Sequence, residues 1–272
     1  MTIPLVVGID GSEASFEAVD WAAAEALRHD VPLHLLHATV TDHEAPGLAA
    51  VASERARKSA PAVRLSSEVV HEEAAAALVG RGRNAFALVL GSRGLGDLAG
   101  LLLGSVSLAV AAHADCPVVV VRGGEEHRYS RFGNVVVGVE EGEGSGTAVR
   151  FAFREAHVRR CRLVAVHAWS VPVGNPAPRG PSGYALQTRR RPPTQVLAEA
   201  LSDTAKRYQD VPVNSEVVEG SARPALLEAA SSSDLLVVGA RRRHGHVGLQ
   251  LGLVNHAVLH LAPCPIAVVP QV

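Results

Sequence analysis

A glycine-rich segment after a predicted strand is the part of this chain best suited to hold a ligand. Residues 91–106 read GSRGLGDLAGLLLGSV, and they follow the apolar run 87–91, which is typical of a buried strand. Gly104 and Ser105 precede a predicted helix, whose first turn offers free backbone N–H groups and the positive end of the helix dipole. Because these groups favour phosphate, the segment predicts an anion site.

An aspartate in another turn could complete such a site. Asp10 follows the apolar run 3–9 and precedes Gly11 and Ser12, where a second helix is predicted to begin. Its carboxylate could accept hydrogen bonds from ribose hydroxyls or an adenine amine, and it could also cap the helix. Asp10 and the glycine-rich segment together predict a site for an adenine nucleotide. The alternative is that the glycines serve only to pack helices against strands.

The chain contains this unit twice. The segment 91–106 returns without a gap at 239–254, as GARRRHGHVGLQLGLV, 148 positions later. Earlier landmarks, such as Gly8 and Gly138, are 130 positions apart, so the second half carries an insertion of 18 residues between Ala168 and Val213. The insertion is rich in Pro, Gly and Arg and is expected to form a mobile surface loop.

Strands alternate with helices in both halves. In the first half, strands are predicted at 3–9, 32–38, 64–70, 87–91 and 116–122, with helices after residue 12 and at 49–60, 72–80 and 105–113. In the second half, strands are predicted at 134–138, 163–168, 213–218, 234–239 and 264–269. Continuous apolar strands joined by helices indicate a parallel sheet covered on both faces. Ligands of such sheets lie beyond the carboxyl ends of the strands, so the turns after the first and fourth strands are the expected site.

Composition restricts the class of protein. Of the 272 residues 47% are hydrophobic and only 4% aromatic, so the core must consist of Val, Leu, Ala and Ile. The net charge of −1 gives no reason to expect nucleic acid or an anionic membrane as a partner. Cys116, Cys161 and Cys264 are expected to be small buried thiols in a reducing compartment. With no signal peptide and no apolar run long enough to span a membrane, a cytoplasmic protein is expected.

The pattern G-x2-G-x9-G-[ST] after a strand, with VGIDGS near the start and CPVVVV late in the half, resembles the universal stress protein family over nearly the whole chain. The resemblance implies an α/β fold of two tandem Rossmann-like (adenine nucleotide alpha hydrolase-like) domains, each an open five-stranded parallel sheet with helices on both faces. The domains would be residues 1–123 and 133–272, here named half one and half two. It also implies that strands 117–122 and 265–269 pair edge to edge, making a pseudo-dimer, and that whole chains form a homodimer.

The resemblance assigns ATP, with or without Mg²⁺, as the cofactor. Gly8 and Asp10 would lie near the adenosine, Ala38 would flank the base, and the glycine-rich segment would hold ribose and phosphates. The implied binding residues of half one are Gly8, Asp10, Ala38, Gly91, Ser92, Arg93, Gly94, Leu95, Gly96, Asp97, Gly104, Ser105 and Val106. The corresponding, weaker set in half two is Gly138, Glu140, Gly239, Arg241 and Gly252.

Half two departs from the pattern at three places, so it is expected to bind ATP weakly or not at all. Glu140 is longer than Asp10 and would intrude on the adenosine, and Leu253 offers no hydroxyl to a phosphate. Arg242 would place a side chain in a positive-φ turn, which costs about 1 kcal/mol or more. The alternative is that the run Arg241–Arg243 supplies positive charge to the phosphates and preserves binding. The changes are from Asp10 to Glu140, from Gly94 to Arg242 and from Ser105 to Leu253.

The favoured function is an ATP-binding stress or dormancy regulator whose state is read by protein partners of unknown identity. No catalytic residue is predicted, because the chain has no G-x4-G-K-[ST] motif, no S-G-G-x-D-S turn and no nucleophile beside an evident base. Slow ATP hydrolysis would be compatible with this view, but an enzyme is not expected. No metal site is predicted either, since His256 and His260 lack an acidic partner and His37 and His167 are expected to be buried strand residues. The alternative function is a nucleotide-free interaction scaffold with degenerate sites.

Overall fold

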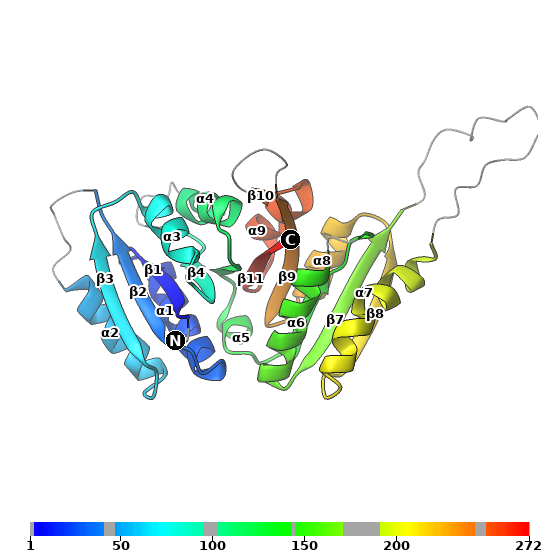
Figure 1. Cartoon of the computed structure of the whole chain (residues 1–272), viewed down its shortest axis with the longest axis horizontal. Coiled ribbons are helices and arrows are strands. Elements are labelled where there is room, and N and C mark those ends of the chain that lie inside the picture. The colour runs from blue at the N-terminus through cyan, green and yellow to red at the C-terminus, as the bar shows by residue number, and fades with distance from the viewer. Residues whose placement is uncertain are drawn as a thin grey trace, which may run out of the picture.

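The chain folds into one continuous sheet with helices on both faces, shown in the computed structural model of Figure 1. Some predicted features lie outside the part of the chain that the structure describes. They are the site residues Leu95, Gly96 and Asp97, and residues 171–190 of the insertion that was expected to form a loop. The structure describes residues 3–40, 47–94, 103–142, 145–170, 191–242 and 249–271.

Half one forms the expected five-stranded parallel sheet, in the order β3-β2-β1-β4-β5. The helix predicted at 72–80 begins two residues later, because the Glu73 carboxylate accepts hydrogen bonds from the backbone N–H groups of Ala75 and Ala76 and so caps it. The elements are β1 (Leu5–Ile9), α1 (Glu13–Arg28), β2 (Leu33–Ala38), α2 (Leu48–Ser59), β3 (Leu65–Val70), α3 (Ala74–Gly82), β4 (Ala87–Gly91), α4 (Ser105–His113) and β5 (Val118–Val121).

Half two repeats this order as β8-β7-β6-β9-β11, again parallel. Its fourth large strand is longer than predicted: it continues to Arg242, where the short strand β10 pairs with it in antiparallel fashion. The elements are β6 (Asn134–Gly138), α6 (Gly146–Arg159), β7 (Arg162–Trp169), α7 (Pro193–Arg207), β8 (Val213–Glu219), α8 (Ala222–Ala230), β9 (Leu235–Arg242), β10 (Leu249–Gln250), α9 (Leu253–Leu261) and β11 (Ile266–Gln271).

The two halves join through their last strands. β5 and β11 pair antiparallel, with Val119 opposite Ala267, so the expected edge-to-edge pairing is confirmed. Each of these strands thereby covers the exposed edge of the other. The linker contains the short helix α5 (Glu125–Arg128) and is anchored to half two, because the Asp234 carboxylate accepts hydrogen bonds from the backbone N–H groups of Phe132 (2.9 Å) and Gly133 (2.8 Å).

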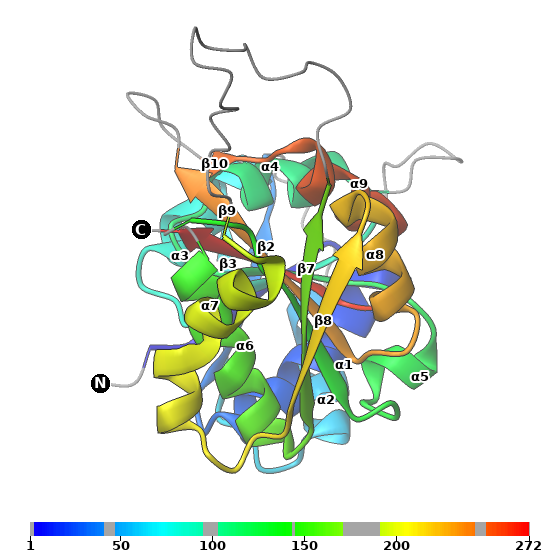
Figure 2. The same cartoon turned by 90° about the vertical axis from the view of Figure 1, so that its right-hand side faces the viewer.

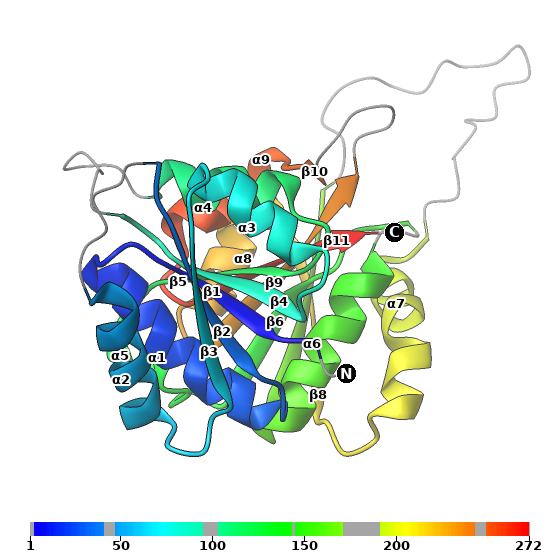
Figure 3. The same ribbon diagram turned by 60° about the vertical axis from the view of Figure 1, so that its left-hand side comes forward.

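Helices divide between the two faces of the sheet. Figure 2 shows α6 and α7 on one side of β7 and β8, with α8 and α9 on the other, and Figure 3 shows α1 and α2 opposite α3 and α4. Successive residues of a strand pack against the helices on opposite faces of the sheet. For example, Val7 packs beneath α1, and its neighbour Val6 packs on the opposite face. Among the described residues, no helix has the length and apolar character to cross a membrane.

The three cysteines are free thiols packed against their surroundings, as expected. Cys116 and Cys264 are buried, and Cys161 is half-buried. Burial raises the pKa of Cys116 to about 12 and that of Cys264 to about 11, which keeps both sulfurs protonated at neutral pH.

Candidate functional site

The order of strands in half one places its candidate site between β1 and β4. β1 lies between β2 and β4, so the chain leaves β1 toward one side of the sheet and returns through β4 on the other. In sheets of this kind the helices that follow two such strands diverge, and ligands bind in the crevice expected at the carboxyl ends. Asp10 follows β1 and the turn Ser92–Gly94 follows β4 at this same edge.

Asp10 is held in one orientation by the helix cap beside it. Its Oδ1 atom accepts hydrogen bonds from the backbone N–H (2.9 Å) and the hydroxyl (2.6 Å) of Ser12. Ser12, not Asp10, is the N-cap of α1, and its Oγ accepts a hydrogen bond from the backbone N–H of Ser15 (3.2 Å). The backbone of Gly11, at φ 88°, makes the tight turn between them. Asp10 therefore supports the cap while its second oxygen faces the turn after β4.

Gly94 packs directly against that carboxylate. A Cβ atom added to Gly94 would lie 2.6 Å from Oδ2 of Asp10. Gly94 does not have a positive φ, so the reason expected for this glycine is wrong, and close approach to Asp10 is the constraint. Gly91 is required for packing instead, because a Cβ atom there would lie 2.6 Å from the backbone carbonyl of Ala14 in the first turn of α1.

The first turn of α4 completes this edge. Its N-cap, Gly104, has no side chain to occupy the amide groups of the turn, and the Gly104 N–H donates to the carbonyl of Ser92 (2.8 Å). The buried Ser107 hydroxyl donates to the carbonyl of Gly91 (2.7 Å), so α4 is fixed to the end of β4. Ser105, the first residue of the helix, is exposed. The helix start is thus positioned at the crevice, as the anion-site prediction requires.

The other predicted residues of half one lie around the same edge of the sheet. Ala38 ends β2 and is half-buried, and its neighbour His37 directs Nδ1 to the carbonyl of Ile9 (2.9 Å). Gly8 owes its lack of a side chain to packing, since a Cβ there would lie 2.7 Å from a methyl carbon of Leu90. Val106 packs against the core beneath α4. His37 is thus a strand residue bonded to the backbone, but it is half-buried, whereas a buried histidine was expected.

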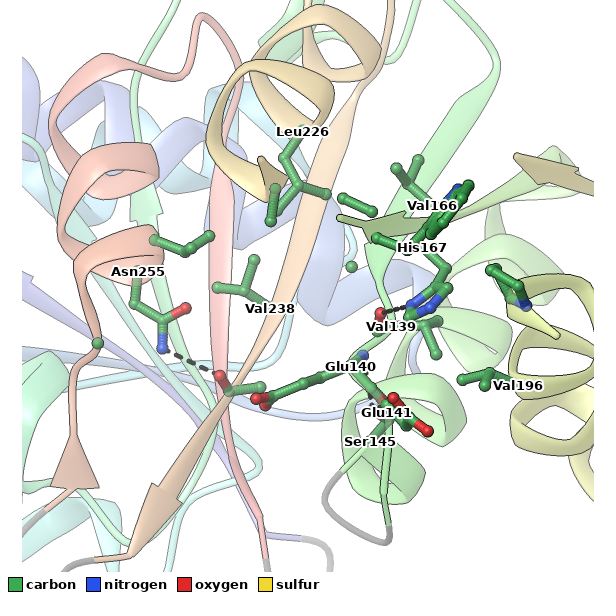
Figure 4. A pocket seen from close by; sticks show the side chains of 18 of the residues that line it. Val139, Glu140, Glu141, Ser145, Val166, His167, Val196, Leu226, Val238 and Asn255 are labelled. Carbon is green, nitrogen blue, oxygen red and sulfur yellow. Dashed lines mark hydrogen bonds between the residues drawn. The ribbon is translucent and has the colours of Figure 1, made fainter. Parts of the chain in front are cut away.

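In half two the five predicted residues line one cavity of about 970 Å³. The cavity lies at the carboxyl ends of β6 and β9, the same place in the repeat, and Figure 4 shows it from close by. Sequence reasoning missed the side chains that form much of its wall, among them Trp169, Val196 and Leu226. The first two flank the insertion, which half one does not have. The predicted residues that line the cavity are Gly138, Glu140, Gly239, Arg241 and Gly252.

In half two, the residues that correspond to the predicted ligand-binding turn of half one belong to a strand. Arg241 and Arg242 belong to β9 and pair with Gln250 and Leu249, so Arg242 does not occupy the positive-φ turn that was expected of it. The Glu140 carboxylate and the Arg241 guanidinium form an ion pair of 3.0 Å at the edge of the cavity. Arg241 therefore holds the Glu140 carboxylate and shares its own charge with it.

A second polar cluster lies where α1 and α6 meet, and the sequence analysis did not find it. His29 Nε2 is 3.2 Å from a Glu155 oxygen, and Arg159 Nη2 is 2.7 Å from Glu25 Oε1. Glu25 and Glu155 are 130 positions apart, as are His29 and Arg159, so each half contributes corresponding residues across a pseudo-twofold axis. The repeat offset was the signal that could have revealed this cluster.

Charge within this cluster is balanced by arginines. Burial opposes ionisation of Glu155, but the hydrogen bond from His29 and the charges of His29, Arg159 and Arg154 outweigh it and lower its pKa below 4.5. Glu25, His29 and Glu155 have the spacing of metal ligands, with ligand atoms within 4.8 Å of one another. Arg28 and Arg159 both donate to Oε1 of Glu25, so guanidinium groups already supply the positive charge that a cation would bring.

Comparisons with known proteins agree with the repeat. A model of the Universal stress protein family matches residues 1–122 and again residues 131–270. A universal stress protein of Mycolicibacterium smegmatis is 34% identical, over 97% of this chain and 96% of that protein. A solved universal stress protein from Archaeoglobus fulgidus, 16% identical, has a TM-score of 0.70 over 99% of this chain and 98% of its own. A universal stress protein solved in complex with cAMP is 32% identical over 44% of this chain and 96% of its own, with a TM-score of 0.39.

Proposed function

Because the chain belongs to the universal stress protein family, as both matches to the family model establish, we propose that it is an ATP-binding regulator with its nucleotide held mainly in half one. The observation that carries this proposal is the contact between Asp10 and Gly94 at the crevice between β1 and β4. A side chain at Gly94 would clash with the carboxylate, so the glycine lets the turn after β4 approach Asp10, whose carboxylate a ribose could use.

Each part of the nucleotide has a matching group in this edge of half one. The Asp10 carboxylate, oriented by Ser12, would accept hydrogen bonds from ribose hydroxyls. The uncapped amide groups at the start of α4, with the exposed Ser105 hydroxyl, would hold the phosphates. Gly8 would lie near the adenosine, and Ala38 would flank the base. Mg²⁺, if it accompanies the triphosphate, would neutralise part of its charge.

We propose binding without efficient turnover. The Ser12 hydroxyl donates to Asp10 and accepts from Ser15, so it is committed to the helix cap and is not activated as a nucleophile. A hydrogen-bonded chain of Ser66, His34 and Glu68 lies on β2 and β3, away from the crevice. Arg81 holds that Glu68 with bonds of 2.6 and 3.0 Å, which makes the chain a cross-strand structural contact.

A regulatory role follows from linkage between binding and stability. A ligand that binds only the folded state stabilises it by about 2.7 kcal/mol when its concentration is 100 times Kd. The fraction of half one that holds ATP would therefore rise with the ATP concentration, and this would stabilise one conformation of the protein. Protein partners would read that conformation.

Isothermal titration of ATP, ADP, AMP and cAMP tests the proposal. The wild type should bind ATP, and Asp10→Ala or Gly94→Arg should weaken that binding at least tenfold. The matched control is Glu140→Ala, the corresponding change in half two, which should leave the affinity of half one unchanged. ATP affinity unaltered by Asp10→Ala would refute the site assignment. A protein that binds none of the four nucleotides would favour the scaffold function.

The homodimer and the cytoplasmic location stay predictions. Light scattering after size-exclusion chromatography measures the molecular mass directly, and a homodimer should have twice the 28.4 kDa of one chain.

A further inference from the structure

The cavity of half two has an apolar interior of the size that small-molecule sites have. Its volume of about 970 Å³ lies at the upper end of the range for ligand pockets. Figure 4 shows that the side chains of Val139, Val166, Val196, Leu226 and Val238 line it from four different elements and the turn after β6. An aromatic ligand fits such an interior, because its flat faces gain most from contact with apolar side chains.

Several polar groups around the cavity are bonded to backbone atoms. His167 directs Nδ1 to the carbonyl of Val139 (2.9 Å), and Asn255 Nδ2 donates to the carbonyl of Gly239 (2.9 Å). The Ser145 hydroxyl donates to the carbonyl of Glu140 (2.9 Å). These bonds fix the wall in one shape, so the ligand enters a preformed site and loses less binding energy to ordering the protein. Trp169, which is half-buried, also lines the cavity.

The amide groups at the start of α9 are uncapped like those of α4, but the hydroxyl that half one offers beside them is replaced in half two. Leu253, the first residue of α9, is 90% exposed and stands where half one has Ser105. The Gln271 side chain accepts a hydrogen bond from the backbone N–H of Thr147 (3.3 Å) in the first turn of α6. The same side chain covers Gly239, whose Cβ would lie 2.2 Å from its Nε2. The start of α9 therefore offers no hydroxyl to a phosphate, and one backbone amide in the first turn of α6 already donates to Gln271.

Charge at the rim also disfavours phosphate. Glu140 and Glu141 both line the cavity, and both are exposed. Arg241 pairs with Glu140, and Arg191 pairs with Glu199 (3.0 Å), so each of these guanidinium groups is shared with a carboxylate. Among the described side chains, an entering phosphate would therefore meet the negative charge of Glu141 while Arg191 and Arg241 are already paired. The side chains of Arg242 and Arg243 lie outside the part that the structure describes.

We propose that the half-two cavity binds an uncharged aromatic ligand of nucleoside size and selects against its phosphorylated forms. The two halves then sense different molecules, a nucleotide in half one and a neutral ligand in half two. This inference goes beyond the proposed function, because it requires nothing to be bound in half one.

The test uses adenosine, AMP and ATP as probes, titrated into a variant whose half one is blocked. Ala38→Phe fills the base region of half one, and its matched counterpart Ala168→Phe fills the half-two cavity, which Ala168 lines. In Ala38→Phe, adenosine should bind at least ten times more tightly than AMP or ATP and should change the fluorescence of Trp169. In the double variant with Ala168→Phe, adenosine binding should disappear while thermal unfolding stays cooperative.

Removing the rim charges provides a second variant that does not depend on filling the cavity. Replacing both exposed carboxylates, in Glu140→Gln/Glu141→Gln, should raise AMP affinity several-fold and leave adenosine affinity within twofold. Equal affinity for adenosine and AMP before this change, or no adenosine binding at all, would overturn the inference. ATP binding that Asp10→Ala abolishes and Ala168→Phe spares belongs to half one, so failure of this inference is distinguishable from failure of the proposed function.

Discussion

Replacing Arg159 with methionine tests how the two halves are held in register. The Arg159 side chain is 2% exposed, and its guanidinium donates to Glu25 Oε1 (2.7 Å) and to the Ser130 hydroxyl (2.8 Å). Methionine keeps much of the volume and removes every donor. Glu25 keeps Arg28 and Glu155 keeps His29, but two buried carboxylates lose the cation that lies between them.

The size of the effect follows from burial. Removing one partner of a buried ion pair costs about 3–5 kcal/mol, because the buried charges that remain lose compensation, here a part of it. The entropy of unfolding, at about 2.1 cal/mol/K per residue, comes to about 0.57 kcal/mol/K for a chain of this length. Dividing the two gives a fall in Tm of about 5–9 °C.

Differential scanning calorimetry measures this fall. The control is Arg64→Met, because Arg64 pairs with Asp30 at 3.1 Å but the two side chains are 56% and 89% exposed. An exposed pair is worth about 0–1 kcal/mol, so the control should shift Tm by no more than about 2 °C. If Arg159→Met shifts Tm no more than the control does, the cluster does not hold the halves together.

Three other predictions concern pH, thiol reactivity and the glycines. The folded-state pKa of Glu155 lies below its ordinary 4.5, so its stabilisation is complete above that value and is lost as the pH falls through the folded-state pKa. The difference in unfolding free energy between wild type and Glu155→Gln should therefore narrow on acidification, and a difference constant from about pH 7 to pH 3 would contradict this. Cys116, with a pKa of about 12, should react with a disulfide reagent at neutral pH only after unfolding, and rapid labelling of the native protein would contradict its burial. Gly91→Ala should cost about 1–3 kcal/mol, since its Cβ meets backbone, whereas Gly94→Ala should mainly weaken ATP binding, and a reversed order in urea unfolding would show the two glycines to be misassigned.

Features carried by local pattern were predictable from the sequence. Apolar runs such as 87–91 became buried strands, and the switch point between β1 and β4 followed from the order of elements. Residues at matching repeat positions make matching contacts, since His37 bonds to the carbonyl of Ile9 and His167 to that of Val139, each at 2.9 Å. A repeat in sequence thus translated into a repeat in hydrogen bonding.

Features that depend on contact across the fold were not predictable. The charge cluster of Glu25 and Glu155 exists only because the pairing of β5 with β11 brings α1 beside α6. Gly94 reads like a turn glycine, and only the position of the Asp10 carboxylate reveals that space is the constraint. The continuation of β9 to Arg242 depends on partners in β10 and β11 that no local pattern identifies.

A crystal structure of the protein with a non-hydrolysable ATP analogue is the most direct test of the central claim. The account predicts the analogue in half one, with its ribose beside Asp10 and its phosphates at the start of α4. An analogue bound only in half two, or a complex in which the analogue contacts neither Asp10 nor the start of α4, would contradict it.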